Sequence, residues 1–307
     1  MSDTVKTGGE IFVLPGSMFG KTAYLRCCMS LFISSLNSGS NGNCYYVGNS
    51  DEAVLIDGGI SCRETEKRMK RLGLSLRKVK AIFVSHEHGD HVHGVPALSK
   101  KYGLPVYITS STLQNGRLSL KENLVISFRP YETVTVGSIT VTAFPKLHDA
   151  ADPHSFIVAS ESVKVGVFTD IGSPCEHVIS HFQQCHAAFL ETNYDEGMLD
   201  GGRYPYHLKE RIRGGKGHLS NSQAVDLFCN HRPAFMTHLF LSHLSQDNNR
   251  PKLVQELFSR VAGDTQIILA PRNKETRLYH IRSTISPVRK PVRTRSVTAQ
   301  FQLSLFS

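Results

Sequence analysis

Tryptophan is absent from this 307-residue sequence, and three larger features are missing as well. No apolar run approaches the roughly 18 residues that a membrane-spanning helix needs, so we expect no membrane association. Residues 1–28 hold neither the apolar core nor the cleavage site of a secretory signal. The seven cysteines form no CxxC pair and have no regular spacing. This pattern is typical of reduced thiols and predicts a cytoplasmic protein rather than a disulfide framework.

Acidic residues are fewer than basic ones, which gives the chain a formal net charge of +9. A basic balance favours a polyanionic partner such as nucleic acid. Much of the excess lies in residues 282–307, which carry five basic side chains and no acidic one. The charge therefore gives only modest support for such a partner, since a solvated tail explains it equally well.

Length and composition fit one large domain, because 40% of the residues are hydrophobic and can form a sizeable core. We expect that domain to cover residues 30–282. Residues 1–29 have mixed polarity and several glycines, so we expect a disordered extension or an upstream segment, with Met29 as an alternative start. Residues 283–307 form a basic tail that either binds DNA or has no role.

Apolar runs bounded by turn residues predict a mixed α/β (α+β) fold. Strands are predicted at residues 31–36, 44–47, 53–56, 81–84, 105–109, 124–128, 139–144, 156–159, 164–168, 187–190, 235–241 and 266–269. Helices are predicted at residues 62–72, 95–102, 174–182, 220–230 and 252–261, with a short helix from Ser110. Several strands are apolar throughout, as expected where both faces of a sheet are covered. The order of elements predicts two similar halves, although no sequence repeat is visible.

Residues 85–94, SHEHGDHVHG, are the most informative stretch of the chain. A predicted strand leads into it, and an extended strand end points His86 and His88 to the same side because side chains alternate. The turn that follows brings Asp90 and His91 toward a neighbouring point. Imidazole and carboxylate are the ligands that zinc, manganese or iron take in catalytic sites, so the stretch predicts two adjacent divalent metal ions.

This stretch resembles the HxHxDH signature of the metallo-β-lactamase superfamily, and the resemblance extends over about residues 31–281. It implies a four-layer αβ/βα sandwich that holds two metal ions between the edges of its sheets. It also implies the ligands: His86, His88 and His148 for one metal, Asp90, His91 and His243 for the other, and Asp170 between them. Asp90 is predicted to be catalytic as well as a ligand.

Two carboxylates add detail to this site. Asp170 stands where antibiotic-hydrolysing members of the superfamily usually carry Cys. A carboxylate bridge is typical of the members that hydrolyse phosphodiesters and thioesters. Its two oxygens can hold cations roughly 3.5–4 Å apart, and the metals then supply a hydroxide nucleophile. Asp57 follows a predicted strand, and we expect it to orient the histidine loop.

The run Gly217-His218-Leu219-Ser220-Asn221 opens a predicted helix. Ser220 or Asn221 can cap that helix, and the free N–H groups at its start can bind phosphate. Resemblance to RNase Z-like nucleases implies that Glu191 pairs with His218. In that arrangement His218 protonates the leaving oxygen and Glu191 orients it. The alternative for His218 is a phosphate contact without proton transfer.

Four segments together resemble the YycJ/WalJ (VicX) family: residues 36–43, 203–212, 217–221 and 241–249. The resemblance implies a metal-dependent 5′→3′ exonuclease that acts on double-stranded DNA in repair. Tyr194 departs from it, since relatives often have His there. Lys209 and Arg211 lie in a segment rich in Tyr, Pro and His, where they can bind phosphates while an aromatic ring stacks on a base. A solvated helix face is the alternative.

Three alternatives to this function stay open at the level of sequence. The same fold also serves thioesterases and lactonases, which act on small molecules and would not need His218. An RNase Z-like nuclease would act on RNA. A binding module with structural metals is the third, but structural sites are normally closed, whereas this ligand set leaves positions for water.

Overall fold

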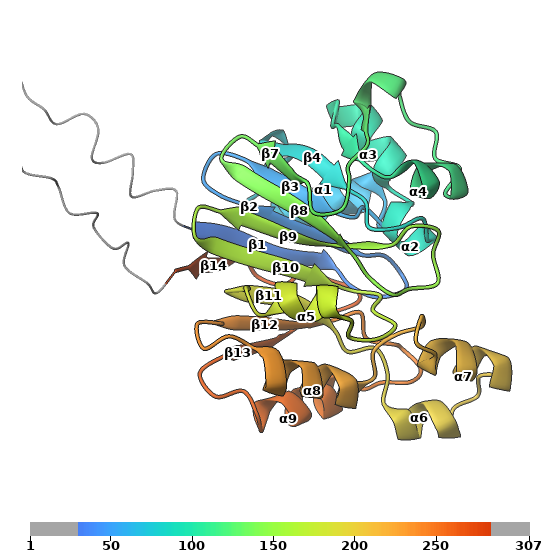
Figure 1. Ribbon diagram of the computed structural model, residues 1–307. Coiled ribbons are helices and arrows are strands. Elements are labelled where there is room, and N and C mark those ends of the chain that lie inside the picture. Colours follow the sequence, from blue (N-terminus) through green and yellow to red (C-terminus); the bar gives the residue numbers. More distant parts are fainter. Residues whose placement is uncertain (1–29, 284–307) are drawn as a thin grey trace, which may run out of the picture.

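The computed structural model describes residues 30–283, which fold into two facing sheets covered by helices on their outer sides (Figure 1). This is the four-layer sandwich that the sequence predicted. The proposed extension at residues 1–29, the alternative start at Met29 and the basic tail from residue 284 onward lie outside the described residues.

The first sheet has the strand order β14-β1-β2-β3-β4-β5-β6. Its strands are β1 (Ser30–Asn37), β2 (Cys44–Gly48), β3 (Ala53–Ile56), β4 (Val79–Phe83), β5 (Val106–Tyr107), β6 (Val125–Ile126) and β14 (Tyr279–Arg282). The pairs from β14 to β3 are antiparallel and those from β3 to β6 are parallel. A sheet of this kind needs a crossover between each pair of parallel strands.

The second sheet has the order β13-β12-β11-β10-β9-β8-β7 and repeats this mixture. Its strands are β7 (Thr133–Val136), β8 (Ile139–Pro145), β9 (His154–Ser160), β10 (Val163–Phe168), β11 (Ala187–Glu191), β12 (His238–Ser242) and β13 (Gln266–Leu269). The pairs from β7 to β10 are antiparallel and those from β10 to β13 are parallel. The two halves of the chain therefore share one architecture, as predicted.

Helices connect the parallel strands and close the sandwich. They are α1 (Cys62–Arg71), α2 (Gly89–Val92), α3 (Val95–Tyr102), α4 (Ser110–Asn115), α5 (Glu176–Phe182), α6 (Glu196–Gly201), α7 (Tyr206–Arg213), α8 (Asn221–His231) and α9 (Pro251–Ser259), with 3-10 turns at Leu76–Lys78 and Glu122–Leu124. In Figure 1, α8 and α9 lie along the outer face of the second sheet. No helix among residues 30–283 is long and apolar enough to cross a bilayer.

Three hydrophobic cores hold these layers together. The largest lies between the two sheets and includes Tyr45, Phe83, Phe156, Phe189 and Phe240. A second core packs the second sheet against its helices. A third packs the first sheet against α1 and α3. Burial of these side chains on both faces explains why the central strands are apolar throughout.

The predicted elements are largely confirmed, with boundaries that shift by a few residues. The strand predicted at residues 235–241 begins only at His238, and the strand predicted at residues 124–128 is reduced to β6. Strands β7 and β14 and helices α6 and α7 were not predicted. Both missed strands are short and lie at or next to the edges of their sheets, where only one face is well buried and the apolar pattern is weak.

Candidate metal centre and catalytic pair

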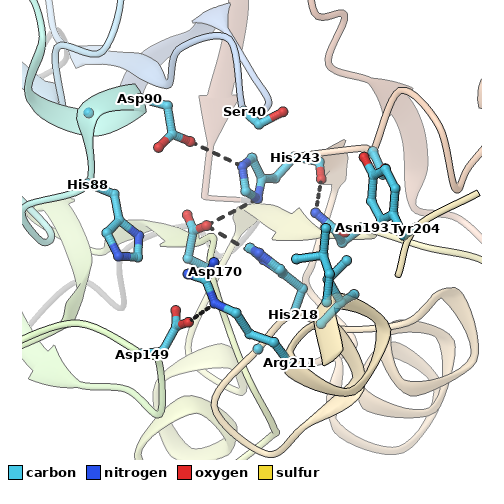
Figure 2. Close-up of a pocket in the computed structure, with 15 residues that line it drawn as sticks. Ser40, His88, Asp90, Asp149, Asp170, Asn193, Tyr204, Arg211, His218 and His243 are labelled. Carbon is cyan, nitrogen blue, oxygen red and sulfur yellow. Dashed lines mark hydrogen bonds and ion pairs between the residues drawn. The ribbon is translucent and has the colours of Figure 1, made fainter. Parts of the chain in front are cut away.

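The predicted ligands converge along one edge of the two sheets, because each follows the carboxyl end of a strand. Figure 2 shows several of them turned toward a common centre. The ligand positions are His86, His88, Asp90 and His91 after β4, His148 after β8, Asp170 after β10 and His243 after β12. Asp57, which was expected to orient the histidine loop, follows β3. Strands of both sheets therefore build the site, as the sequence predicted.

His86, His88 and His148 form the first group. The Nδ1 atom of His88 lies 3.1 Å from Nε2 of His86 and 3.3 Å from Nε2 of His148. Ligands at about 2.0–2.1 Å around one tetrahedral cation are separated by about 3.3 Å. The three nitrogens therefore have the spacing of ligands to a single metal.

Asp90, His91 and His243 form the second group. The Oδ2 atom of Asp90 lies 3.5 Å from Nε2 of His91 and 3.5 Å from Nε2 of His243. Asp170 lies between the groups: its Oδ2 is 2.9 Å from Nε2 of His91, and its Oδ1 is 3.9 Å from Nε2 of His148. The carboxylate of Asp170 can thus reach a cation in either group.

Four of the imidazoles are oriented by hydrogen bonds to their Nδ1 atoms, which leaves Nε2 directed toward the centre. His91 Nδ1 lies 2.7 Å from Asp57 Oδ2, and His243 Nδ1 lies 2.9 Å from Glu191 Oε1. His148 Nδ1 lies 3.0 Å from the Gly217 carbonyl oxygen, and His86 Nδ1 lies 2.9 Å from Ser85 Oγ. Such bonds fix the ring and its tautomer in metal-binding histidines.

Asp57 also organises the histidine loop itself, as expected. Its Oδ1 accepts a hydrogen bond from the Ser85 backbone N–H at 2.8 Å, and its Oδ2 accepts one from Ser85 Oγ at 2.8 Å. The side chain is fully buried and is not among the residues that line the described cavity. Its contacts therefore assign it to holding His91 and the loop in place.

The backbone is strained at three of these positions. Asp57, Asp170 and His243 have φ angles of 61°, 55° and 55°, a region that residues other than glycine seldom adopt. Beside Asp170, the buried Lys146 donates from Nζ to the Thr169 carbonyl oxygen at 2.7 Å. This bond helps to hold the turn that points Asp170 into the site.

The donor set and its charges fit divalent cations. Among residues 30–283, the buried atoms Asp170 Oδ2 and His243 Nε2 make no hydrogen bond, although each lies beside another predicted ligand, His91 and Asp90 respectively. Buried polar atoms without a hydrogen bond are unusual, and a cation between the ligands would bind both. Burial lowers the pKa of His148 to about 4, so that this imidazole is neutral and free to bind a metal. Burial also lowers the pKa of His243, but Asp170, Asp90 and Glu191 outweigh it and raise the value to about 10. The carboxylates therefore favour positive charge at the position of the second group.

Glu191 and His218 pair beside these two groups. The Oε1 atom of Glu191 accepts a hydrogen bond from His218 Nδ1 at 2.7 Å, and its Oε2 accepts one from the Ile171 N–H at 2.6 Å. Burial raises the pKa of Glu191, but the nearby imidazoles of His218 and His243 lower it to about 2. The carboxylate is therefore ionised, and its hydrogen bond to Nδ1 orients the His218 ring.

A cavity of about 410 Å³ lies over the ligands and contains His218 in its wall. One side consists of ligand residues, including His88, Asp90, Asp170 and His243. The other side consists of residues from α7 and the segment before it: Tyr204, Leu208, Arg211 and Ile212. The cavity therefore has a polar, metal-binding floor and a partly apolar wall.

The predicted phosphate-binding residues Ser220 and Asn221 lie outside the lining of the cavity. Ser220 caps α8 and accepts a hydrogen bond from the Gln223 N–H, while the Asn221 amide bonds to Asn249. Both side chains are buried and neither is among the described residues that line the cavity. Hydrogen bonds within the fold occupy both side chains, so neither is proposed to contact a phosphate.

The two predicted basic residues, Lys209 and Arg211, lie on different faces of α7. Arg211 lines the cavity, where its Nε lies 2.5 Å from Asp149 Oδ2 (Figure 2). Lys209 is on another face of α7 and donates from Nζ to the Asp200 carbonyl oxygen at 2.7 Å. Only Arg211 is therefore placed to contact a molecule in the cavity.

Several cavity residues were not singled out by the sequence analysis. They are Ser40, Asp149, Asn193, Tyr204, Leu208 and Ser245. Asp149 adjoins a predicted ligand in the sequence, and Ser40, Tyr204 and Ser245 lie within the segments that carry the family resemblance. Those segments were the available signal, but only the fold shows which of their side chains face the cavity.

Comparison with known proteins agrees with this architecture. A family model described as the metallo-beta-lactamase superfamily matches residues 38–196. Among solved structures, the metallo-beta-lactamase fold protein YhfI from Bacillus subtilis superposes with a TM-score of 0.63. It is 17% identical in sequence, over 82% of this chain and 99% of that one, and so supports the fold alone. Fold and site together define a metallo-hydrolase of this superfamily.

Two curated relatives narrow the assignment. Exodeoxyribonuclease YycJ of Bacillus anthracis is 34% identical over 238 residues, which cover 76% of this chain and 89% of that protein. Exodeoxyribonuclease WalJ of Streptococcus pneumoniae serotype 2 is 29% identical over 227 residues, which cover 72% of this chain and 84% of that protein. Within the superfamily, the chain belongs to the YycJ/WalJ family of nucleases.

Proposed function

We propose that this protein is a metal-dependent 5′→3′ exonuclease that degrades double-stranded DNA in the cytoplasm and acts in DNA repair. The Glu191–His218 pair beside two groups of metal ligands is the observation that carries the proposal. Phosphodiester hydrolysis must stabilise charge at phosphorus and protonate a sugar oxygen, and this arrangement offers groups for both tasks. The names of the two curated relatives support DNA as the substrate.

His86, His88 and His148 would hold one divalent cation, Asp90, His91 and His243 the other, and Asp170 would contact both. Zinc, manganese and iron all suit this donor set. Cations bound there would supply Lewis-acid charge that polarises a phosphate oxygen and activates water.

His218 is the proposed general acid. Its Nδ1–H donates to Glu191 Oε1, so its Nε2 is left for the cavity that it lines. In its imidazolium form, His218 can release a proton from Nε2 to the leaving sugar oxygen. Arg211, in the opposite wall, is the proposed phosphate contact once a substrate oxygen replaces Asp149 as its partner.

A time course with purified protein and manganese tests the substrate and the direction. The substrates are one duplex labelled at the 5′ end, the same duplex labelled at the 3′ end, and matched single-stranded DNA and RNA. We expect mononucleotide release from the 5′ label of the duplex first. Preferential cleavage of RNA would contradict the proposal, and cleavage of none of them would direct attention to thioesters and lactones.

Asp170→Asn tests the metal centre. Loss of the shared carboxylate charge should abolish hydrolysis while the far-ultraviolet circular dichroism spectrum stays unchanged. Asp226→Asn makes the same chemical change on the exposed side of α8 and serves as the control, with wild-type activity expected. Full activity of Asp170→Asn would overturn the assignment.

The leaving group distinguishes proton donation by His218 from a passive phosphate contact. A p-nitrophenolate leaves without protonation, whereas a sugar alkoxide does not. His218→Asn should therefore slow DNA hydrolysis by about 10²–10⁴-fold and slow bis(p-nitrophenyl) phosphate hydrolysis far less. Equal losses on both substrates would show that His218 is not the general acid.

A further inference from the structure

The wall of the cavity opposite the metal ligands combines apolar side chains with one positive charge. Leu208, Arg211 and Ile212 lie three and four positions apart on α7, so they share the face of the helix that lines the cavity. Tyr204 precedes the helix and continues this wall. The wall thus presents an aromatic ring and two aliphatic side chains beside one guanidinium group.

Tyr204 is held in place at both ends. Its backbone leads into Pro205, which caps α7, and its hydroxyl donates to Asp247 Oδ2 at 2.7 Å. The ring is only partly exposed, and Figure 2 shows it on the far side of Asn193 and His243 from the His88 side chain. A fixed ring loses little conformational entropy when a ligand stacks on it.

Hydrogen bonds join two segments that contribute residues to the cavity, the segment after β11 and the loop after β12. Asn193 Nδ2 donates to the His243 carbonyl oxygen at 2.9 Å, and the Ser245 N–H donates to the Asn193 carbonyl oxygen at 2.8 Å. The Asp195 N–H donates to the Asn248 carbonyl oxygen at 2.8 Å. These bonds fix the two segments relative to each other beside the cavity.

The volume of the cavity agrees with the binding of one nucleotide. A volume of about 410 Å³ lies within the range of sites that enclose a single small ligand. A base pair in a duplex presents its edges and buries its faces by stacking, so a ring can stack on a base only where a strand end is unpaired.

We propose that Tyr204 is the platform on which the base of the terminal, unpaired nucleotide stacks while its phosphate lies over the metal ligands. The inference rests on the proposed nuclease function and adds the mode of substrate recognition. A ring face accepts every base, so this platform selects the end of a strand without selecting its sequence. Because a base face is free only at an unpaired strand end, the platform favours removal of terminal nucleotides over internal cleavage.

The chain supplies a matched control in Tyr206, two residues further along. Its side chain is 77% exposed. It lies about 200° around the helix from Leu208, because successive residues are about 100° apart, and therefore points away from the cavity. Tyr204→Ala and Tyr206→Ala thus remove the same side chain from the two sides of one segment.

The experiment compares a duplex carrying a normal nucleotide at the attacked end with the same duplex carrying an abasic tetrahydrofuran unit there. The readout is the ratio of kcat/KM for the two substrates. Stacking of one base contributes about 1–3 kcal/mol, so the wild-type ratio should lie between about 5 and 140. In Tyr204→Ala the ratio should fall toward 1, while Tyr206→Ala should keep the wild-type ratio.

Tyr204→Phe keeps the ring and loses the bond to Asp247, so it should retain most of the ratio. This variant also keeps the test valid if Tyr204→Ala fails to fold. A wild-type ratio near 1, or an unchanged ratio in Tyr204→Ala, would overturn the platform in an enzyme that still degrades DNA. A wild-type protein that degrades no DNA would overturn the proposed function, and this inference with it.

Discussion

Replacement of Glu191 by Gln is the most revealing single change, because this carboxylate accepts four hydrogen bonds. Its Oε1 accepts from His218 Nδ1 at 2.7 Å and from His243 Nδ1 at 2.9 Å. Its Oε2 accepts from the Ile171 N–H at 2.6 Å and from the Leu219 N–H at 3.3 Å. Both oxygens are saturated with donors, and the side chain is fully buried.

A glutamine of the same shape cannot satisfy four donors, since one of its ends is itself a donor. If the NH₂ group faces the two backbone N–H groups, buried donors lose their acceptor at about 1–3 kcal/mol each. If it faces the imidazoles, His218 and His243 must each turn Nδ1 into an acceptor. That change moves a proton onto Nε2 of His243, the atom that faces the metal position.

The second orientation harms both functions of the site. Loss of a supporting hydrogen bond reduces metal affinity by about 10–100-fold, and loss of a general acid slows the reaction by about 10²–10⁴-fold. At saturating metal, Glu191→Gln should therefore lower DNA hydrolysis by at least about 10²-fold. It should also release metal from the group formed by Asp90, His91 and His243.

The assay combines metal content after gel filtration, the rate of duplex degradation at saturating manganese, and thermal unfolding. His218→Asn is the comparison, because it should lose rate but keep the same metal content as the wild type. If Glu191→Gln bound as much metal as the wild type and degraded DNA at the rate of His218→Asn, Glu191 would support His218 alone and would have no part in metal binding. Activity within tenfold of the wild type would refute the argument as a whole.

Three further predictions follow from the same geometry. Removal of metal by a chelator should abolish activity and lower the Tm without unfolding the chain, because the three cores hold no ligand; added manganese or zinc should restore activity. Arg211→Ala should weaken DNA binding and reduce the slope of log K against log salt by about 1, whereas Lys209→Ala should leave the slope unchanged; fluorescence anisotropy at several salt concentrations measures both. Lys146→Met removes the donor to the buried Thr169 carbonyl oxygen, so urea unfolding should show a loss of about 1–3 kcal/mol, and wild-type stability would contradict this.

The ligand set could be predicted because its residues carry a local signal. Four of them lie within the six residues from His86 to His91, and the others follow apolar runs that read as strands. Parallel strands end at the same edge of a sheet, so residues at their carboxyl ends are brought together whatever their separation in the sequence. The strand ends marked these positions, and the resemblance to the superfamily supplied their predicted roles as ligands.

The substrate side of the cavity could not be predicted in the same way. Asp149, Tyr204 and Ser245 line it through contacts between distant loops, and no periodic pattern marks which side chain of a loop faces inward. Ser220 and Asn221 show the opposite error: their residue types suit a phosphate site, yet bonds to Gln223 and Asn249 satisfy them within the fold. Residue type predicts what a side chain can bind, and only its neighbours decide whether it is free to do so.

The division of ligands between the two sheets carries a consequence for stability. The first half of the chain supplies His86, His88, Asp90 and His91, and the second half supplies His148, Asp170 and His243. Each metal group takes ligands from both halves, so neither half holds a complete site. Because a ligand that binds only the folded state stabilises it, cations at this edge should strengthen the contact between the sheets. The edge that carries the candidate metal ligands thus joins the two halves of the sandwich, and the His243 N–H already donates to Ser38 Oγ of the first half at 2.7 Å.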